Sequence, residues 1–129
     1  MGSVGAVQPL FDAHLHYDAE DAAHYTPEEI VAQLQGNRVL AAIVTSQPPE
    51  QVLQLHAQAP GLILPILGVY RTPADKETWM SDASLPARVE HALAEGPWRG
   101  VGELHLYAKD PRRPVFTQIV ELSTSAGLP

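Results

Sequence analysis

Two patterns of hydrophobic residues alternate along the chain. Short segments that are continuously apolar, or apolar at every second position, predict β-strands; they lie at 10–16, 39–44, 62–70 and 100–107. Apolar residues at helical spacing, bounded by capping residues, proline or glycine, predict helices; they lie at 26–36, 49–59, 85–96 and 114–126. A strand followed by a helix, repeated four times, is typical of parallel strands joined by crossover helices.

Local signals indicate where some of these elements begin. Thr26, Pro27 and Glu29 offer an N-cap, a proline at the first helical position and a glutamate that can close a capping box. Pro65 cannot donate to a strand ladder, so pairing of the third strand is expected to begin at or just after it. The polar segment 71–84 is longer than a usual connection and is expected to be a functional loop.

Composition and charge restrict the class of protein. The 129 residues are 45% hydrophobic and 18% charged, which is typical of one globular domain. Fifteen acidic against eight basic residues give a formal charge of −7, which argues against a nucleic-acid partner because the phosphate backbone would be repelled. The chain has no cysteine, so disulfides and thiolate chemistry are excluded.

The same features predict where the protein resides. A chain without cysteine fits a reducing compartment. No apolar run reaches the roughly 20 residues of a membrane helix, and the first residues show no basic region followed by an apolar one. We therefore expect a cytoplasmic protein without a membrane partner.

The first strand carries the clearest candidate chemistry. Asp12, His14 and His16 alternate with apolar residues, so the two imidazoles lie on one face near the carboxyl end of the strand. Two neutral imidazoles in this position can bind one divalent cation. The alternative is that they are two ordinary histidines at a strand end.

The fourth predicted strand offers a carboxylate and another imidazole. Glu103 and His105 share a face, opposite to leucines that would pack on helices. A carboxylate inside a fold must be paired, hydrogen-bonded or bound to a metal, because an isolated buried charge is costly. For Glu103 the alternative to a metal is an ion pair with Lys or Arg, and His105 would either be a ligand or line the pocket.

An Asp-x-His-x-His ending the first strand and a Gly-Glu-x-His in the fourth resemble the amidohydrolase superfamily, in particular its TatD-like and amidohydrolase-related branches. The resemblance implies a (β/α)8 barrel with one or two metals at the carboxyl ends of its strands. It also implies that His14, His16 and Glu103 are ligands. The family's further ligands, two histidines and an aspartate that acts as general base, belong to later strands and have no counterpart here.

The fold class that follows is α/β of TIM-barrel type, with about four β/α units. Residues 1–129 would form a single partial domain, the N-terminal half of a (β/α)8 barrel, which in complete form has about 250 residues.

The function implied by the resemblance is that of a metal-dependent hydrolase, in which metal-activated water attacks an amide, ester or related bond. Zinc is the first expectation for the cofactor, as one or two ions, with manganese, iron or nickel as alternatives. The substrate would be a small molecule, although the nuclease activity of TatD-like proteins stays open, as does decarboxylation. Arg71, His105 and Tyr107 are expected to bind substrate, with Arg71 meeting an anionic group beside Tyr70.

Two other interpretations remain at this point. The chain could be a non-catalytic half-barrel that closes by forming a homo-oligomer or by binding a partner, because unpaired edge strands invite association. It could also be a complete flavodoxin-like sheet, which would need a glycine-rich phosphate loop after the first strand. His16 is followed instead by the acidic segment 17–20, so this interpretation ranks last.

Overall fold

The computed structural model describes residues 7–129, and residues 1–6, including the segment inspected for a targeting signal, lie outside this range. In chain order the elements are β1 (Leu10–His16), α1 (Ala19–Ala22), α2 (Pro27–Gly36), β2 (Val39–Thr45), α3 (Val52–Gln58), β3 (Ile63–Pro65), α4 (Asp75–Thr78), α5 (Leu85–Glu95) and α6 (Pro114–Ser125). Three single-turn 3-10 helices precede α3, follow α4 and precede α6.

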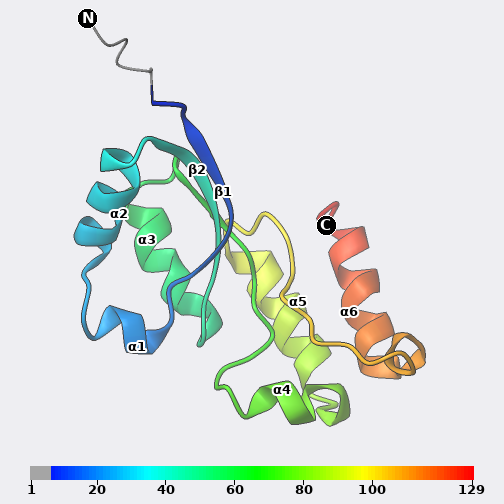
Figure 1. The fold of residues 1–129 in the computed structure, drawn as a ribbon. Helices are drawn as coiled ribbons and strands as arrows, with labels where there is room; N and C mark the ends of the chain where they lie inside the picture. Colours follow the sequence, from blue (N-terminus) through cyan, green and yellow to red (C-terminus); the bar gives the residue numbers. More distant parts are fainter. Residues whose placement is uncertain (1–6) are drawn as a thin grey trace, which may run out of the picture.

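The sheet consists of three parallel strands in the order β1-β2-β3. Helices α2 and α3 follow β1 and β2 and lie together beside them, whereas α5 and α6 pair with each other farther along the chain (Figure 1). Because the strands are parallel, all carboxyl ends lie at the same edge of the sheet. The order also differs from the 2-1-3 arrangement of flavodoxin-like sheets.

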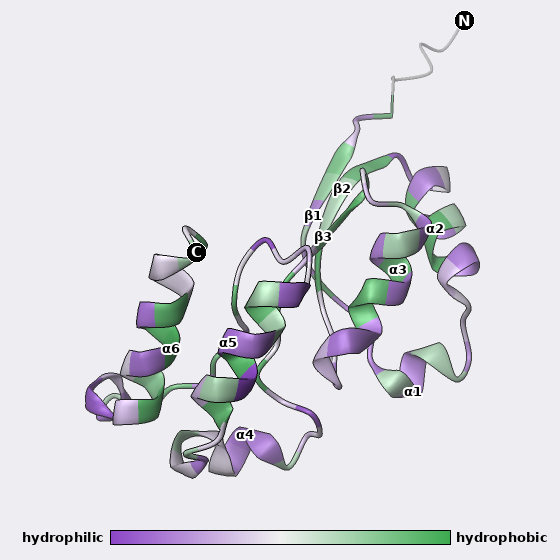
Figure 2. Ribbon diagram, turned by 180° about the vertical axis from the view of Figure 1, so that it is seen from behind, coloured by the Kyte–Doolittle hydropathy of each residue, from purple (hydrophilic) through white to green (hydrophobic). Residues whose placement is uncertain are grey.

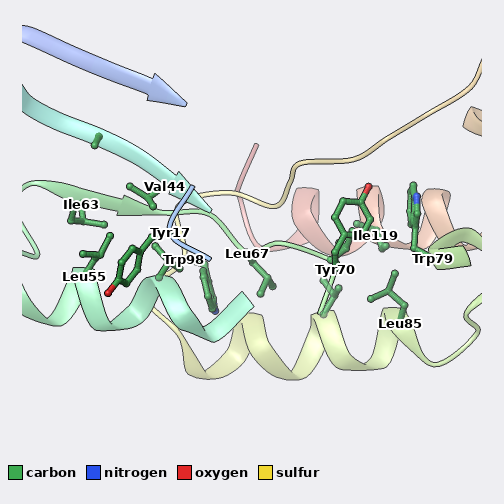
Figure 3. Packing of buried hydrophobic residues seen from close by; sticks show 14 of the residues in the cluster. Tyr17, Val44, Leu55, Ile63, Leu67, Tyr70, Trp79, Leu85, Trp98 and Ile119 are labelled. Carbon is green, nitrogen blue, oxygen red and sulfur yellow. The ribbon is translucent and has the colours of Figure 1, made fainter. Parts of the chain in front are cut away.

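One hydrophobic core connects the sheet to the helices (Figure 3). Val44 and Ile63 from the strands pack above Leu55 of α3, while Leu67 and Leu85 continue the cluster toward α5. Other fully or almost fully buried members are Tyr17, Ala42, Val52, Val69, Tyr70, Trp79, Val89, Trp98 and Ile119. β1 itself is half-buried to exposed along its length, and Leu15 is its side chain that packs against this core.

The helices are short and amphipathic. Hydrophobic and hydrophilic residues alternate along α3, α5 and α6 (Figure 2), as expected for helices that pack by one stripe on a core. The longest, α6, has 12 residues. Within residues 7–129 we find no helix with the length and apolar character needed to cross a membrane.

Several predicted elements are confirmed. β1 spans the predicted residues, and α5 ends at the predicted glycine, with Gly96 as its C-cap. The capping box of α2 forms as expected: the Glu29 N–H donates to Thr26 Oγ1 at 3.2 Å, and the Thr26 N–H donates to Glu29 Oε2 at 2.8 Å. The segment predicted as a functional loop contains α4 and a further 3-10 turn, Trp79–Ser81.

The predicted half-barrel of four β/α units is wrong. The sheet has three strands, and the predicted third strand is reduced to Ile63–Pro65. Pairing was expected to begin at or after Pro65, yet the strand ends there, consistent with the missing proline N–H. Segment 100–107 contributes one parallel bridge, Leu67 to Val101, and no strand.

The backbone donors of the predicted fourth strand explain this difference. The Gly102 N–H still donates to the Leu67 carbonyl at 3.0 Å, as in a sheet. Beyond it, the His105 N–H donates to the hydroxyl of Tyr70, and the Tyr107 N–H donates to the carboxylate of Asp110. Side chains therefore take the donors that a strand ladder would need, and the segment leaves the sheet.

Candidate metal centre

Three side chains from two distant parts of the chain converge on one point. His14 Nε2 and His16 Nε2 are 3.0 Å apart, and both lie near Oε2 of Glu103, at 3.4 and 3.2 Å. They form a group of potential metal ligands within the described part of the chain. The ligand set expected from the sequence is thus brought together, although its carboxylate comes from an irregular segment and not from a strand.

Local structure determines where each ligand points. His14 and His16 project from the same face of β1 because alternate residues of a strand share a face. Asp12 Oδ1 accepts the backbone N–H of His14 at 3.1 Å. Glu103 follows the bridge at Val101, where the chain has just left the edge of the sheet.

The spacing of the three donor atoms is compatible with a bound cation. Two ligands bound at about 2.1 Å to a tetrahedral zinc ion lie about 3.4 Å apart, close to the three distances found here. Each imidazole presents a nitrogen to the same carboxylate oxygen. Without a cation, only the protons carried by the two rings would separate these three electron-rich atoms. A divalent cation satisfies all three donors at once, because neutral imidazole and carboxylate are both ligands of zinc.

Solvent can reach this group from one side. The side chain of His14 is 62% exposed, whereas those of His16 and Glu103 are 33% and 37% exposed. Thr45, Gly68 and Tyr70 complete a small cavity of about 10 Å³ against His16 and Glu103, near the lower limit for one water molecule. The site thus has a protein-lined side and an open side.

His105 and Tyr70 stand next to Glu103. His105 Nε2 lies 3.4 Å from Glu103 Oε1, and His105 Nδ1 lies 3.0 Å from the Tyr70 hydroxyl. Tyr70 is 3% exposed, and this burial raises the pKa of its phenol above the ordinary value; a hydrogen bond from the His105 backbone lowers it in part, and Glu103 raises it further. His105 is therefore placed beside the ligand group, where the sequence predicted a pocket residue.

Asp18 is a neighbour that the sequence analysis did not select. One carboxylate oxygen lies 3.8 Å from His16 Nδ1, and the other accepts the N–H of Gln47 at 2.7 Å. Metal-bound histidines commonly have a carboxylate near the second ring nitrogen, which orients the ring. In the sequence, Asp18 could have been selected by its position two residues after His16. It was not, because segment 17–20 is acidic as a whole.

The other two expected substrate contacts are Arg71 and Tyr107, and both have exposed side chains. Arg71 is exposed and lines a cavity of about 140 Å³ together with Leu67, Leu85 and Arg88, a lining that includes none of the three ligands. Tyr107 is 69% exposed, and its backbone N–H is held by Asp110. For Glu103, the ion-pair partners found within residues 7–129 are histidines, not the lysine or arginine of the alternative interpretation.

Comparison with known proteins does not assign a family. Searches against protein-family models, curated proteins and solved structures returned no match. The resemblance to the amidohydrolase superfamily therefore rests on the residues of this chain alone.

Proposed function

We propose that this chain carries the metal site of an amidohydrolase-like, metal-dependent hydrolase, with His14, His16 and Glu103 as ligands. The observation that supports the proposal is the convergence of these three donor atoms, 3.0 to 3.4 Å apart, from β1 and from a segment 87 residues later. Surface acidic clusters arise by chance, but two imidazoles sharing one carboxylate oxygen form a ligand set with the spacing of a bound cation.

The number of ligands favours catalysis over a purely structural role. Structural zinc sites use four protein ligands, whereas catalytic sites commonly use three and leave a position open. The described residues supply three, and the exposure of His14 leaves the group open toward solvent. A divalent metal held by these residues would lower the pKa of a coordinated water toward neutrality and would polarise a carbonyl or phosphoryl oxygen.

The ligand types also define the expected metal and substrate. Two imidazoles and one carboxylate suit zinc first, with manganese, iron or nickel as alternatives. Small-molecule amides, esters and related bonds are the proposed substrates. A cytoplasmic location is part of the same proposal and rests on the chain having no cysteine.

A homo-oligomer is proposed on a separate observation. β1 is an edge strand, and its Leu10 and Phe11 are 53% and 55% exposed. An exposed edge with apolar side chains is a surface on which another strand can pair. A mass measurement in solution checks this: a dimer that Phe11→Lys converts to a monomer supports the edge, and a monomeric parent chain refutes it.

The function is tested by metal-dependent turnover. The purified chain, loaded with zinc or manganese, is assayed with a nitrophenyl ester, an anilide and a bis-nitrophenyl phosphodiester. We expect at least one substrate to be hydrolysed. A chelator should abolish this hydrolysis, and the double variant His14→Ala/His16→Ala should not show it. His91→Ala is the matched control, because His91 lies on α5 and pairs with Glu95.

Each outcome bears on the proposal. Turnover that survives both chelation and the double substitution refutes the assigned site. Stoichiometric metal without turnover of any of the three substrates refutes the hydrolase function while leaving the metal centre in place.

A further inference from the structure

We propose that Tyr70 and His105 are positioning residues that hold Glu103 so that its Oε2 atom faces the cation. This inference rests on the proposed metal site and adds a role for two residues that do not themselves bind the metal. It is carried by a chain of contacts running from the buried phenol of Tyr70, through the ring of His105, to the other carboxylate oxygen of Glu103.

The first step concerns the proton of the Tyr70 hydroxyl. The hydroxyl oxygen accepts the His105 backbone N–H at 2.7 Å, and a backbone amide can only donate. The hydroxyl proton is thus free to be donated to the second neighbour, His105 Nδ1, at 3.0 Å. In the proposed arrangement Nδ1 accepts this proton and therefore carries none of its own in the neutral ring.

The second step follows from the chemistry of imidazole. A neutral ring with an unprotonated Nδ1 carries its proton on Nε2. His105 Nε2 lies 3.4 Å from Glu103 Oε1, so the ring nitrogen that carries the proton in this tautomer is the one beside the carboxylate. The oxygen beside His14 and His16 is the other one, Oε2. The two carboxylate oxygens are thereby divided between His105 and the cation.

The third step is the rigidity of the support. Tyr70 is 3% exposed, and its ring packs edge-on against Trp79 with centroids 6.3 Å apart; Figure 3 shows the two rings at the same end of the core. His105 itself lies on an irregular segment and has a 43% exposed side chain. The buried phenol therefore holds His105 at two points, its backbone N–H and its Nδ1 atom, in a segment without regular secondary structure.

The consequence is an effect on metal affinity and not on the number of ligands. Residues that orient metal-binding side chains typically change affinity by about 10- to 100-fold when removed. Tyr70→Phe retains the buried ring and deletes only the hydroxyl. We expect zinc to bind this variant about 10- to 100-fold more weakly, with one ion per chain still bound at saturation. Tyr25→Phe is the control, because Tyr25 is 52% exposed and lies outside this chain of contacts.

The deciding readout is the tautomer of His105, measured by ¹⁵N NMR of histidine-labelled, metal-free protein at a pH where the ring is neutral. We expect the Nε2–H form in the parent chain and in Tyr25→Phe, and a loss of this preference in Tyr70→Phe. An Nδ1–H tautomer in the parent chain would overturn the proposal. Unchanged zinc affinity in Tyr70→Phe would do so as well.

A second pair of variants covers the case in which Tyr70→Phe does not fold. His105→Ala removes the donor to Glu103, whereas His105→Gln retains an N–H on a side chain of similar reach. Weaker zinc binding by His105→Ala, with partial recovery in His105→Gln, supports the role of His105 as a positioning residue. Equal zinc affinities of the two variants refute it. If the parent chain binds no zinc, the metal site fails, but the tautomer measurement still decides whether Tyr70 orients His105.

Discussion

His16 Nε2 lies 3.2 Å from Glu103 Oε2, although the two residues are separated by 87 positions and by the width of the sheet. His16 ends β1 at one edge, and Glu103 follows the bridge that Val101 makes beyond β3. Neighbouring strands are about 4.8 Å apart, so three spacings span about 14 Å. Because the chain leaves the sheet after this bridge, strand spacing does not fix the position of Glu103, and its carboxylate can meet the imidazoles of β1.

A site assembled from both edges of the sheet couples metal binding to folding. A ligand that binds only the folded state stabilises it by about 2.7 kcal/mol at a concentration 100 times its dissociation constant. We expect zinc at that excess to raise the free energy of unfolding of the parent chain by about this amount, measured by urea denaturation.

The same titration on variants locates the effect. His16→Ala should lose most of the stabilisation by zinc, while His91→Ala should retain it. Equal stabilisation of His16→Ala and the parent chain would place the zinc elsewhere.

Gly68 has little room for a side chain beside the ligands. A Cβ at this position would lie 3.1 Å from both the Ser46 carbonyl oxygen and Thr45 Oγ1, and the carbonyl belongs to the backbone. Such overpacking typically costs about 1–3 kcal/mol, which is the expected loss in the free energy of unfolding of Gly68→Ala.

Gly36→Ala is the matched control for this substitution, because a Cβ there meets nothing within 4 Å. It lies at the end of α2, where alanine is expected to add up to about 1 kcal/mol. A Gly68→Ala chain as stable to urea as Gly36→Ala would show that the backbone beside the site can move freely.

Asp82 should contribute a pH-dependent part of the stability. The Ser84 hydroxyl donates to its carboxylate at 2.6 Å, and Arg88 donates at 2.7 Å; the Ser84 hydrogen bond is the main cause that lowers the pKa of Asp82 below 3.8. A lowered pKa in the folded state stabilises the fold above the unfolded value, and this stabilisation is lost as the pH falls through the folded value.

We therefore expect the free energy of unfolding to fall less between pH 7 and pH 3 in Asp82→Asn than in the parent chain. Urea denaturation at both pH values measures this difference, and Glu121→Gln, on an exposed position of α6, controls for the loss of one charge. An identical pH dependence in Asp82→Asn and the parent chain would contradict the assigned role.

The parts of the fold that the sequence predicts correctly are those specified by local chemistry. The α2 capping box needs only Thr26 and Glu29, three residues apart. From Phe11 to His16 the sequence of β1 has a period of two, so the hydrophobic pattern alone is enough to assign both histidines to one face. Their approach to Glu103 followed from a family resemblance and not from any local pattern.

The failures come from long-range competition for backbone donors. Segment 100–107 alternates like a strand, but the buried hydroxyl of Tyr70 and the carboxylate of Asp110 take the N–H groups of His105 and Tyr107. Neither interaction is visible in the hydrophobic pattern. The role of Tyr70 beside His105 was hidden for the same reason, since it depends on a contact 35 residues away.

The most direct test of the metal centre is the visible spectrum of the protein with cobalt(II) in place of zinc. Equimolar cobalt should give the intense absorption of a site with four or five ligands, and the signal should be lost in His14→Ala/His16→Ala and in Glu103→Ala but retained in His91→Ala. A spectrum like that of hydrated cobalt in the parent chain, or one unchanged by Glu103→Ala, would contradict the assignment of His14, His16 and Glu103 as one metal site.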